Sequence, residues 1–297
     1  MASKTKLDEL VAQEIKKYEG ILVPIKASFA ERVCVRTVPC AKLHPNPEDE
    51  FCFPEIGPNY QIINDYMRTY QRYGTMRPNE LVQDTLTVEK THPDGYMILN
   101  GHHRWAAFLQ LGVKKVPVSI VNLTHETDIE NMLNDSEHDK RVTLDLDEVV
   151  FCREEDTPME KELPFPFNRL YKERIRLGIP ALLNYLGKQG YDIWVYTADY
   201  YSYEYLRAYF KKYSVKVDGI ITGTRRKEKG AKEARKRTEQ RFRAKYKETI
   251  HIDRNMVLRT FRDTKEHEKF EIDAKMEDWS REVLKYIKGQ IQNEKEK

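Results

Sequence analysis

Cysteines and long apolar runs are scarce in this sequence. The four cysteines, at positions 34, 40, 52 and 152, have neither a CxxC spacing nor a second matching pair, so neither a zinc ribbon nor a disulfide framework is indicated. No apolar run approaches the roughly 20 residues needed to span a bilayer. The first 20 residues also lack the continuous apolar segment of a secretory signal. We therefore expect a cytoplasmic protein with no membrane partner.

The length and composition indicate two globular domains. The chain has 297 residues, about twice the usual domain size, of which 40% are hydrophobic and 33% are charged. Each half is long enough to bury its own core. We predict a first domain at residues 1–125, a linker at 126–139 and a second domain at 140–297.

Positive charge is concentrated in one segment, although the net charge of the chain is only +3. Residues 224–247 contain twelve Lys and Arg against three Glu, which gives a local charge of +9. Such a segment either contacts nucleic acid or is the solvated face of a long helix. Nucleic acid is therefore one partner that the sequence allows.

The first half mixes helices and strands in the manner of an α+β domain. Apolar residues recur at helical spacing at 4–18 and at 60–73. Two strand-like runs flank the turn sequence HPDG at 92–95, which predicts a hairpin. A helix that opens near Arg104 and a strand at 116–121 complete this part of the chain.

The segment Gly101-His102-His103-Arg104 joins the hairpin to this helix. A strand that runs into a glycine and then directly into a helix presents backbone N–H groups at the positive end of the helix dipole, and this geometry receives phosphate. His102 and His103 would add donors there, and Arg104 is suited to bidentate phosphate contact. Two adjacent histidines could equally be surface residues, or metal ligands without a third partner.

With its flanking segments PNPEDEF, DGYMILN and RWAAFLQLG, this turn resembles the ParB/sulfiredoxin-like domain over about residues 30–122. The resemblance implies binding of a nucleoside triphosphate or diphosphate, with phosphates held by the Gly-x-x-Arg turn. It also implies either a switch in DNA partition or transfer of phosphate from a nucleotide to a small acceptor. His102 stands where sulfiredoxins have a cysteine, which argues against sulfiredoxin chemistry.

Three consecutive acids, Glu48, Asp49 and Glu50, match the region where kinase-type members of this family place a catalytic acid. The sequence does not distinguish among the three. A role in supporting a metal or in capping a helix fits them equally well.

The second half alternates strands and helices. Strands are expected at 141–151, 191–198, 217–223 and 248–253, and a mainly helical segment at 167–189. This alternation predicts an α/β domain with a parallel sheet and helices on both faces.

Acidic and hydroxyl side chains follow three of these strands. Asp145 and Asp147 are two residues apart, so in an extended strand they would project to the same side, and two close carboxylates favour a cation such as Mg²⁺ between them. Thr197 and Asp253 end later strands. Open parallel sheets bind ligands at the carboxyl ends of their strands, where all four residues would meet.

These residues, with the sequence DLDEVV at 145–150, resemble the ordered motifs of haloacid-dehalogenase (HAD) phosphatases over about residues 140–290. The resemblance implies a three-layer domain in which Asp145 is the nucleophile and Asp147 the general acid and base. Thr197 and a lysine, Lys232 in preference to Lys229, would contact the phosphoryl group. Asp145, Asp147 through its carbonyl, and Asp253 would hold Mg²⁺.

One departure and one spacing bear on this reading. The fourth motif usually carries a second acid, whereas Arg254 follows Asp253 here. Only about forty-five residues separate Asp147 from the strand that carries Thr197, so any cap domain over the site should be small. A small cap admits a phosphorylated small molecule, a nucleic-acid end or a protein.

The leading interpretation is a nucleotide-binding domain joined to a magnesium-dependent phosphatase. One alternative is a DNA-binding partition-type regulator with a structural HAD-like half. The other is a nucleotide-dependent kinase of small molecules in the first half.

Overall fold

The computed structural model describes residues 6–18, 20–78, 84–151, 157–224, 231–264 and 267–295, without the side chains of 231–235 and 294–295. The chain forms two compact units, with the boundary between Leu123 and Thr124. No helix in the described ranges combines the length and the hydrophobicity that a transmembrane segment needs.

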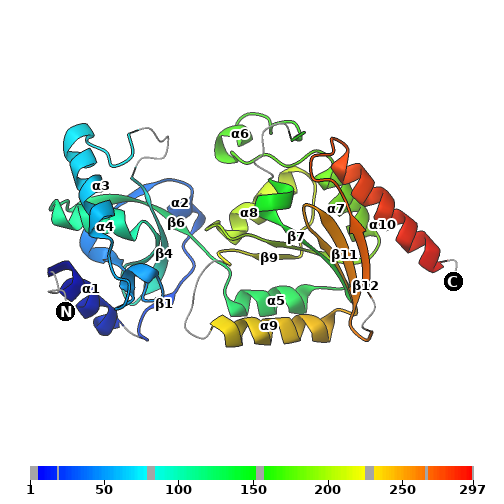
Figure 1. Ribbon diagram of the computed structural model, residues 1–297, viewed down its shortest axis with the longest axis horizontal. Helices are drawn as coiled ribbons and strands as arrows, with labels where there is room; N and C mark the ends of the chain where they lie inside the picture. The colour runs from blue at the N-terminus through cyan, green and yellow to red at the C-terminus, as the bar shows by residue number, and fades with distance from the viewer. Residues whose placement is uncertain are drawn as a thin grey trace. The chain divides into compact units, whose positions relative to one another are not determined.

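The first unit is a mixed α/β structure built on one sheet (Figure 1). Its helices and short 3₁₀ turns are α1 (Lys6–Tyr18), α2 (Phe29–Arg32), η1 (Cys40–Lys42), η2 (Glu50–Cys52), α3 (Tyr60–Tyr73) and α4 (His102–Gln110). Its strands are β1 (Val23–Pro24), β2 (Arg36–Pro39), β3 (Leu43–His44), β4 (Leu86–His92), β5 (Tyr96–Asn100) and β6 (Lys115–Val121).

The sheet of the first unit has the order β2-β6-β4-β5-β3, and β1 pairs with β4. β4 and β5 form the antiparallel hairpin that the HPDG turn predicts. Helices α3 and α4 pack on each other, and the core beneath them buries large side chains such as Ile63, Trp105 and Phe108. This arrangement sets the start of α4 directly after β5.

The second unit contains a second sheet with helices on both faces (Figure 1). Its helical elements are α5 (Glu126–Asp135), the π-helical turn η3 (Leu146–Val150), α6 (Phe167–Leu170), α7 (Ile179–Lys188), α8 (Tyr203–Lys212), α9 (Ala231–Lys245) and α10 (Trp279–Lys295). Its strands are β7 (Lys140–Asp145), β8 (Tyr191–Tyr196), β9 (Gly219–Ile221), β10 (Glu248–Ile252), β11 (Met256–Phe261) and β12 (His267–Glu271).

The second sheet has the order β12-β11-β10-β7-β8-β9. The four strands from β10 to β9 are parallel, whereas β11 and β12 extend the sheet as an antiparallel hairpin pair. Successive side chains of a strand face opposite sides of a sheet, and this alternation divides the apolar residues between two cores.

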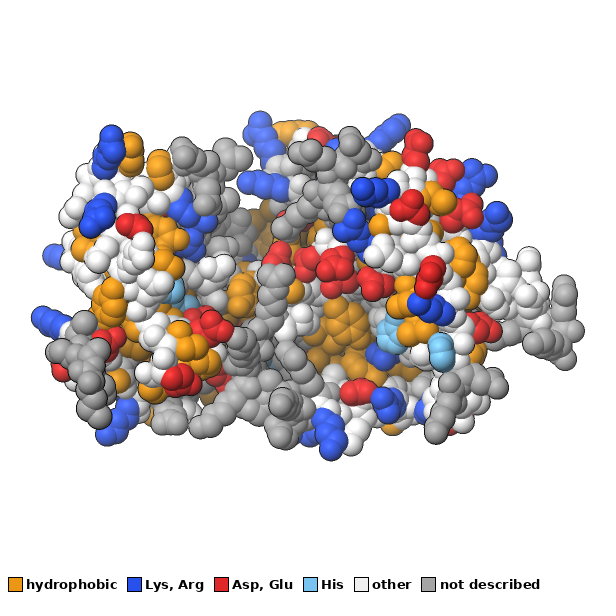
Figure 2. All heavy atoms as spheres, viewed as in Figure 1, with side chains coloured by type: hydrophobic (Ala, Val, Ile, Leu, Met, Phe, Trp, Pro, Cys, Tyr) orange, Lys and Arg blue, Asp and Glu red, His pale blue; other side chains and the backbone are white. Residues whose placement is uncertain are grey.

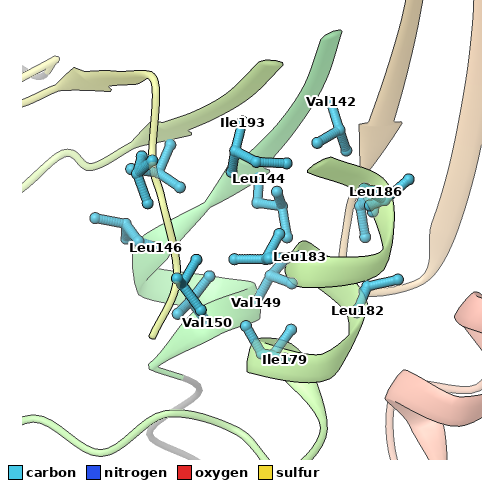
Figure 3. Close-up of a cluster of buried hydrophobic side chains, with 14 of the residues drawn as sticks. Val142, Leu144, Leu146, Val149, Val150, Ile179, Leu182, Leu183, Leu186 and Ile193 are labelled. Atoms are coloured by element: carbon cyan, nitrogen blue, oxygen red, sulfur yellow. The ribbon is translucent and has the colours of Figure 1, made fainter. Parts of the chain in front are cut away.

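The larger core lies on the face that packs against α7 and includes Val142 and Leu144 of β7 and Leu182, Leu183 and Leu186 of α7 (Figure 3). The side chains of η3 join the same cluster, because Leu146, Val149 and Val150 point inward after the strand ends. The strand that carries Asp145 is therefore anchored on both sides of its carboxyl end.

The opposite face of the sheet is covered by α5 and α9, which lie side by side (Figure 1). Ile129, Met132 and Leu133 of α5 form a smaller core with Trp194 and Phe242. Residues 126–139, expected to be a linker, therefore include a helix packed in the second unit. The segment is mostly polar, and its three buried apolar residues find their partners on the second sheet and on α9 only in the folded chain.

Two predicted elements differ from the structure. The strand expected at 141–151 ends at Asp145, because the Asp145 carboxylate caps the following turn. The helix expected at 167–189 is divided into α6 and α7, and Gly178 precedes α7 with a φ of 83° in the left-handed region. The hairpin of β11 and β12 has no counterpart in the sequence analysis.

Candidate functional sites

The carboxyl ends of three adjacent strands meet at one edge of the second sheet. β7 lies between β8 and β10, and Leu144 is in register with Val195 on one side and Ile252 on the other. Asp145, Thr197 and Asp253 follow those positions by one or two residues. The parallel pairing therefore brings the predicted acidic and hydroxyl residues to the same edge, as the strand pattern predicts.

Asp145 caps the turn that follows its strand. Its Oδ1 accepts hydrogen bonds from the backbone N–H groups of Asp147 and Glu148, each at 2.8 Å. Burial raises the pKa of Asp145, and the nearby carboxylates of Asp147 and Asp253 raise the pKa further, against the lowering effect of the two N–H donors. A cation that enters the site would stabilise the ionised form of Asp145.

Asp147 lies on the π-helical turn and not on the strand, so the predicted alternation of Asp145 and Asp147 along one strand is wrong. The side chain of Asp147 turns toward β8. Its two carboxylate oxygens accept from the Thr197 hydroxyl at 3.0 Å, and one accepts from the Ala198 N–H at 2.9 Å. The structure thus joins Asp147 and Thr197 directly.

Asp253 opens the tight turn between β10 and β11. Its backbone N–H donates to the Met256 carbonyl at 2.8 Å, and its Oδ1 accepts from the Arg254 N–H at 2.7 Å. The residue that the sequence analysis notes as a departure, Arg254, therefore supports the turn with its backbone.

A hollow of about 410 Å³ opens beside these acids; we call it the sheet-face hollow. It is lined by Thr143, Leu144, Asp145, Glu148, Tyr196, His251, Ile252 and Asp253. Figure 2 shows acidic side chains gathered on this unit next to a recess with hydrophobic side chains at its base. Asp145 and Asp253 thus share one cavity, although they are far apart in the sequence.

Four polar residues of this hollow are absent from the sequence-based prediction: Thr143, Glu148, Tyr196 and His251. A signal for two of them exists, because Thr143 and His251 stand two positions before Asp145 and Asp253 and so face the same side of their strands. The Thr143 hydroxyl and His251 Nδ1 are hydrogen-bonded at 2.7 Å. Burial, with the nearby charge of Arg141, lowers the pKa of His251 to about 4.

The predicted magnesium site has only part of its ligands in place. Within the described ranges, no three His, Cys, Asp or Glu side chains form a ready metal cluster. The Asp147 carboxylate is engaged by Thr197 and Ala198. Carboxylate oxygens of Asp145 and Asp253 line the same hollow, and such hard donors fit Mg²⁺.

The predicted lysine cannot be placed at this site. Lys229 lies outside the described residues, and Lys232 falls in the first part of α9, where only the backbone is described.

In the first unit, the predicted phosphate turn and the acidic segment lie together. His102 is buried, and its Nε2 accepts a hydrogen bond from the Asn46 backbone N–H at 3.1 Å. With Nε2 as the acceptor, Nδ1 carries the proton and faces Asp49 Oδ2 at 3.5 Å. Among the three predicted acids, Asp49 thus lies beside the helix start.

His103 has a similar structural use. Its Nε2 accepts from the N–H of Asn59 at 3.2 Å, and Asn59 caps α3. Both imidazoles pack on Phe51, at centroid distances of 5.5 and 5.1 Å. The sequence predicts that both histidines donate to phosphate. The Nε2 atom of each histidine instead accepts a backbone hydrogen bond.

Gly101 and Arg104 are in close contact at the start of α4. Gly101 has a φ of 106°, and a Cβ placed there would lie 2.7 Å from Arg104 Nη2 and 2.6 Å from Leu86 Cδ2. Only glycine fits this position, because both the backbone conformation and the approach of the guanidinium exclude a side chain. The backbone of Gly101 is therefore directly accessible to the arginine at this turn.

The described part of the basic segment is largely neutralised within the chain. Arg237 makes a bidentate pair with Glu126 of α5, with both distances at 3.0 Å. Arg241 pairs with Glu126 and Glu130. The solvated-helix interpretation therefore describes these arginines better than a free nucleic-acid surface. Part of the segment, at 225–230, lies outside the described residues.

Residues 27–137 match the family model of the ParB N-terminal domain. This match confirms the predicted ParB-like character of the first half and extends it through α5. It ends before β7, so it does not bear on the carboxylate edge of the second unit. The comparison with curated protein sequences gave no significant match.

Solved structures with similarity to this chain include the chromosome-partitioning protein ParB from Caulobacter crescentus complexed with CTP-gamma-S, at 22% identity over 36% of this chain and 56% of that chain, with a TM-score of 0.24. A conserved hypothetical protein from Pyrococcus furiosus has 17% identity over 38% of this chain and 47% of that chain, with a TM-score of 0.23. The chain thus spans about half the length of these two. A free serine kinase in complex with AMP has 13% identity over 85% of this chain and 95% of that chain, with a TM-score of 0.25.

Proposed function

We propose that the second unit is a magnesium-dependent phosphomonoester hydrolase of the HAD type and that the first unit binds a nucleotide. The observation that carries the first part is the meeting of Asp145, Thr197 and Asp253 at the carboxyl edge of adjacent parallel strands, with Asp145 and Asp253 on one hollow. Parallel sheets bind ligands at this edge.

In this proposal the Asp145 carboxylate attacks phosphorus and forms an aspartyl-phosphate, while the leaving oxygen takes a proton from Asp147. The two N–H donors hold Asp145 Oδ1 and so direct Oδ2 toward the substrate. Asp147 then removes a proton from the water that hydrolyses the intermediate. Mg²⁺ held by Asp145 and Asp253 would neutralise phosphoryl charge.

Asp147 and Thr197 are linked before the reaction starts. The Thr197 hydroxyl, which now donates to Asp147, would donate to a phosphoryl oxygen once substrate binds. This exchange frees the Asp147 carboxyl to turn toward the leaving group. Positioning of this kind is the main contribution that a protein makes to phosphoryl transfer.

The test is magnesium-dependent hydrolysis of p-nitrophenyl phosphate by the full chain. Asp145→Asn removes the nucleophile, so we expect a loss of at least about 10³-fold in kcat, by analogy with removal of other catalytic nucleophiles. Asp263→Asn, on the exposed turn after β11, is the matched control and should keep wild-type activity. A wild type without activity, or an Asp145→Asn protein that retains it, contradicts the proposal.

The proposed nucleotide site is the start of α4. The match to the ParB N-terminal domain supports it, together with the close contact of Arg104 and Gly101 at a helix N-terminus. Calorimetric titration with CTP, ATP and AMP should detect binding that Arg104→Ala weakens and Arg68→Ala, an exposed change on α3, does not. Equal affinities in both variants would exclude this site.

A kinase activity of the first unit is a second candidate, because Asp49 lies 3.5 Å from His102 at the start of α4. If Asp49 acts as a base, nucleotide consumption in the presence of a hydroxylated acceptor falls in Asp49→Asn, while nucleotide affinity is kept. Consumption that survives this change assigns Asp49 to capping η2, where it already accepts from the Phe51 N–H.

A further inference from the structure

The sheet-face hollow extends away from the carboxylates along two strands. Thr143 and His251 lie two positions before Asp145 and Asp253, which places them roughly 7 Å further from the sheet edge on the same face. The hydrogen bond of 2.7 Å between the Thr143 hydroxyl and His251 Nδ1 joins β7 to β10 at this depth. The hollow therefore has an acidic end and a second end of different chemistry.

An aromatic ring forms one wall of the hollow. Tyr196 is paired in register with Asp145, and it packs against the smaller core of Trp194 and Phe242. The Tyr196 hydroxyl lies 3.4 Å from Arg141 Nη1. The position of the Tyr196 ring is thus held by the smaller core and by Arg141 where Tyr196 lines the hollow.

The guanidinium of Arg141 lies next to the second end, where it donates to the hydroxyls of Tyr196 and Thr249, but it is not part of the lining. Apart from the three acids, the lining consists of Thr143, Tyr196, His251 and the strand positions Leu144 and Ile252, with no Lys or Arg among the described residues. In the described part of the chain, the hydrogen bond of His251 is made by Nδ1, and Nε2 makes none. The second end thus suits an uncharged planar group with a hydrogen-bonding edge, and its volume of about 410 Å³ lies in the range of small-molecule sites.

We propose that the hollow binds the nucleoside part of a nucleoside monophosphate, with its phosphate at Asp145 and its base between Tyr196 and His251. This inference rests on the proposed phosphohydrolase function and specifies its substrate class. The reaction is nucleoside monophosphate plus water giving nucleoside plus inorganic phosphate. The base stacks on the Tyr196 ring, and His251 Nε2 contacts its polar edge.

The test compares two phosphomonoesters that differ in the leaving group. Adenosine 5′-monophosphate carries a base, and glycerol 3-phosphate does not. In His251→Ala we expect kcat/KM for adenosine monophosphate to fall about tenfold, the factor for one lost hydrogen bond, and kcat/KM for glycerol phosphate to stay within about twofold. His267→Ala, an exposed histidine on β12, is the matched control and should change neither.

A second measurement separates this inference from the hydrolase proposal. Adenosine, which lacks phosphate, is titrated calorimetrically into the wild type, His251→Ala and Tyr196→Leu proteins. Binding by the wild type that both variants weaken supports the base site even if no phosphatase activity is found, in which case only the hydrolase proposal fails. Hydrolysis of both esters with equal efficiency and no adenosine binding overturns the base site and leaves the hydrolase proposal standing.

Equal losses on both esters in His251→Ala also overturn the inference. That result would mean that His251 acts by holding Asp253 and β10, not by contacting the leaving group.

Discussion

Two glycines on either side of α4, Gly101 and Gly112, have a backbone with positive φ. A Cβ added at Gly101 would meet Leu86 and Arg104, whereas a Cβ added at Gly112, which has a φ of 70°, would have nothing within 4 Å. Substitution of Gly112 therefore measures the cost of backbone strain alone, whereas substitution of Gly101 adds the cost of steric overlap.

We expect Gly112→Ala to lower the free energy of unfolding by about 1–2 kcal/mol, the cost of a left-handed alanine. Gly101→Ala should cost about 1–3 kcal/mol more, because Leu86 and Arg104 must also move. Urea denaturation of both variants measures the difference. Equal losses would mean that the Arg104 side chain relocates freely.

The buried His102 makes the stability of the first unit depend on pH. Burial lowers its pKa from 6.5 to about 4, with Asp49 opposing this shift and His103 adding to it. Between these two pH values the unfolded chain binds a proton that the folded chain does not, so stability is complete above about 6.5 and declines as the pH falls toward 4.

His102→Gln keeps an acceptor for the Asn46 N–H but cannot titrate. Its free energy of unfolding should therefore decline less than that of the wild type between pH 7 and pH 4.5, measured by urea denaturation at each pH. Parallel declines in both proteins would show that His102 is protonated in the folded state.

At the scale of elements, the pairing of α5 with α9 combines a small aromatic core with surface charge. Arg237 and Glu126 face each other across the two helices in bidentate geometry, and both are partly exposed. Exposed pairs contribute little because water and salt screen them.

A double-mutant cycle with Arg237→Ala and Glu126→Ala should give a coupling energy of about 0.2–1 kcal/mol at low salt and less in 1 M NaCl. The pair Arg243 and Glu239, within α9, provides a comparison on one helix. If no coupling is measured at low salt, Glu126 does not neutralise Arg237, and Arg237 is then available to contact a nucleic acid.

At the scale of the whole molecule, the two units have separate apolar cores, one centred on Trp105 and Phe108 and the other on the second sheet. Separate cores predict separate cooperative transitions. Phe108→Ala should destabilise the first unit by about 3–5 kcal/mol and Leu183→Ala the second by about 2–5 kcal/mol.

Hydrogen exchange followed through a denaturant series assigns each transition to its unit. Each substitution is expected to shift the transition of its own unit and to leave the other within error. A common shift of both transitions would show that the units unfold as one body.

The sequence by itself determined the elements and the order of the chemistry-bearing residues. Hydrophobic spacing and turn residues located the hairpin, several helices and the parallel strands, and the positions of Asp145, Thr197 and Asp253 at strand ends placed them on one edge. Local sequence also predicted the ParB-like character of the first half, because the glycine between β5 and α4 allows a backbone conformation that other residues rarely adopt.

Only the tertiary structure decided which hydrogen-bond partners these residues have. Asp147 turns to Thr197, both histidines of the Gly-His-His-Arg segment accept from backbone amides of distant loops, and α5 becomes part of the second unit. Hydrogen-bond partners and cavities depend on which strands and loops become neighbours, and that choice depends on packing across the whole core. A local pattern indicates the direction of a side chain only where the predicted strand continues, which it does not at Asp147, and the partner of a side chain depends on the fold.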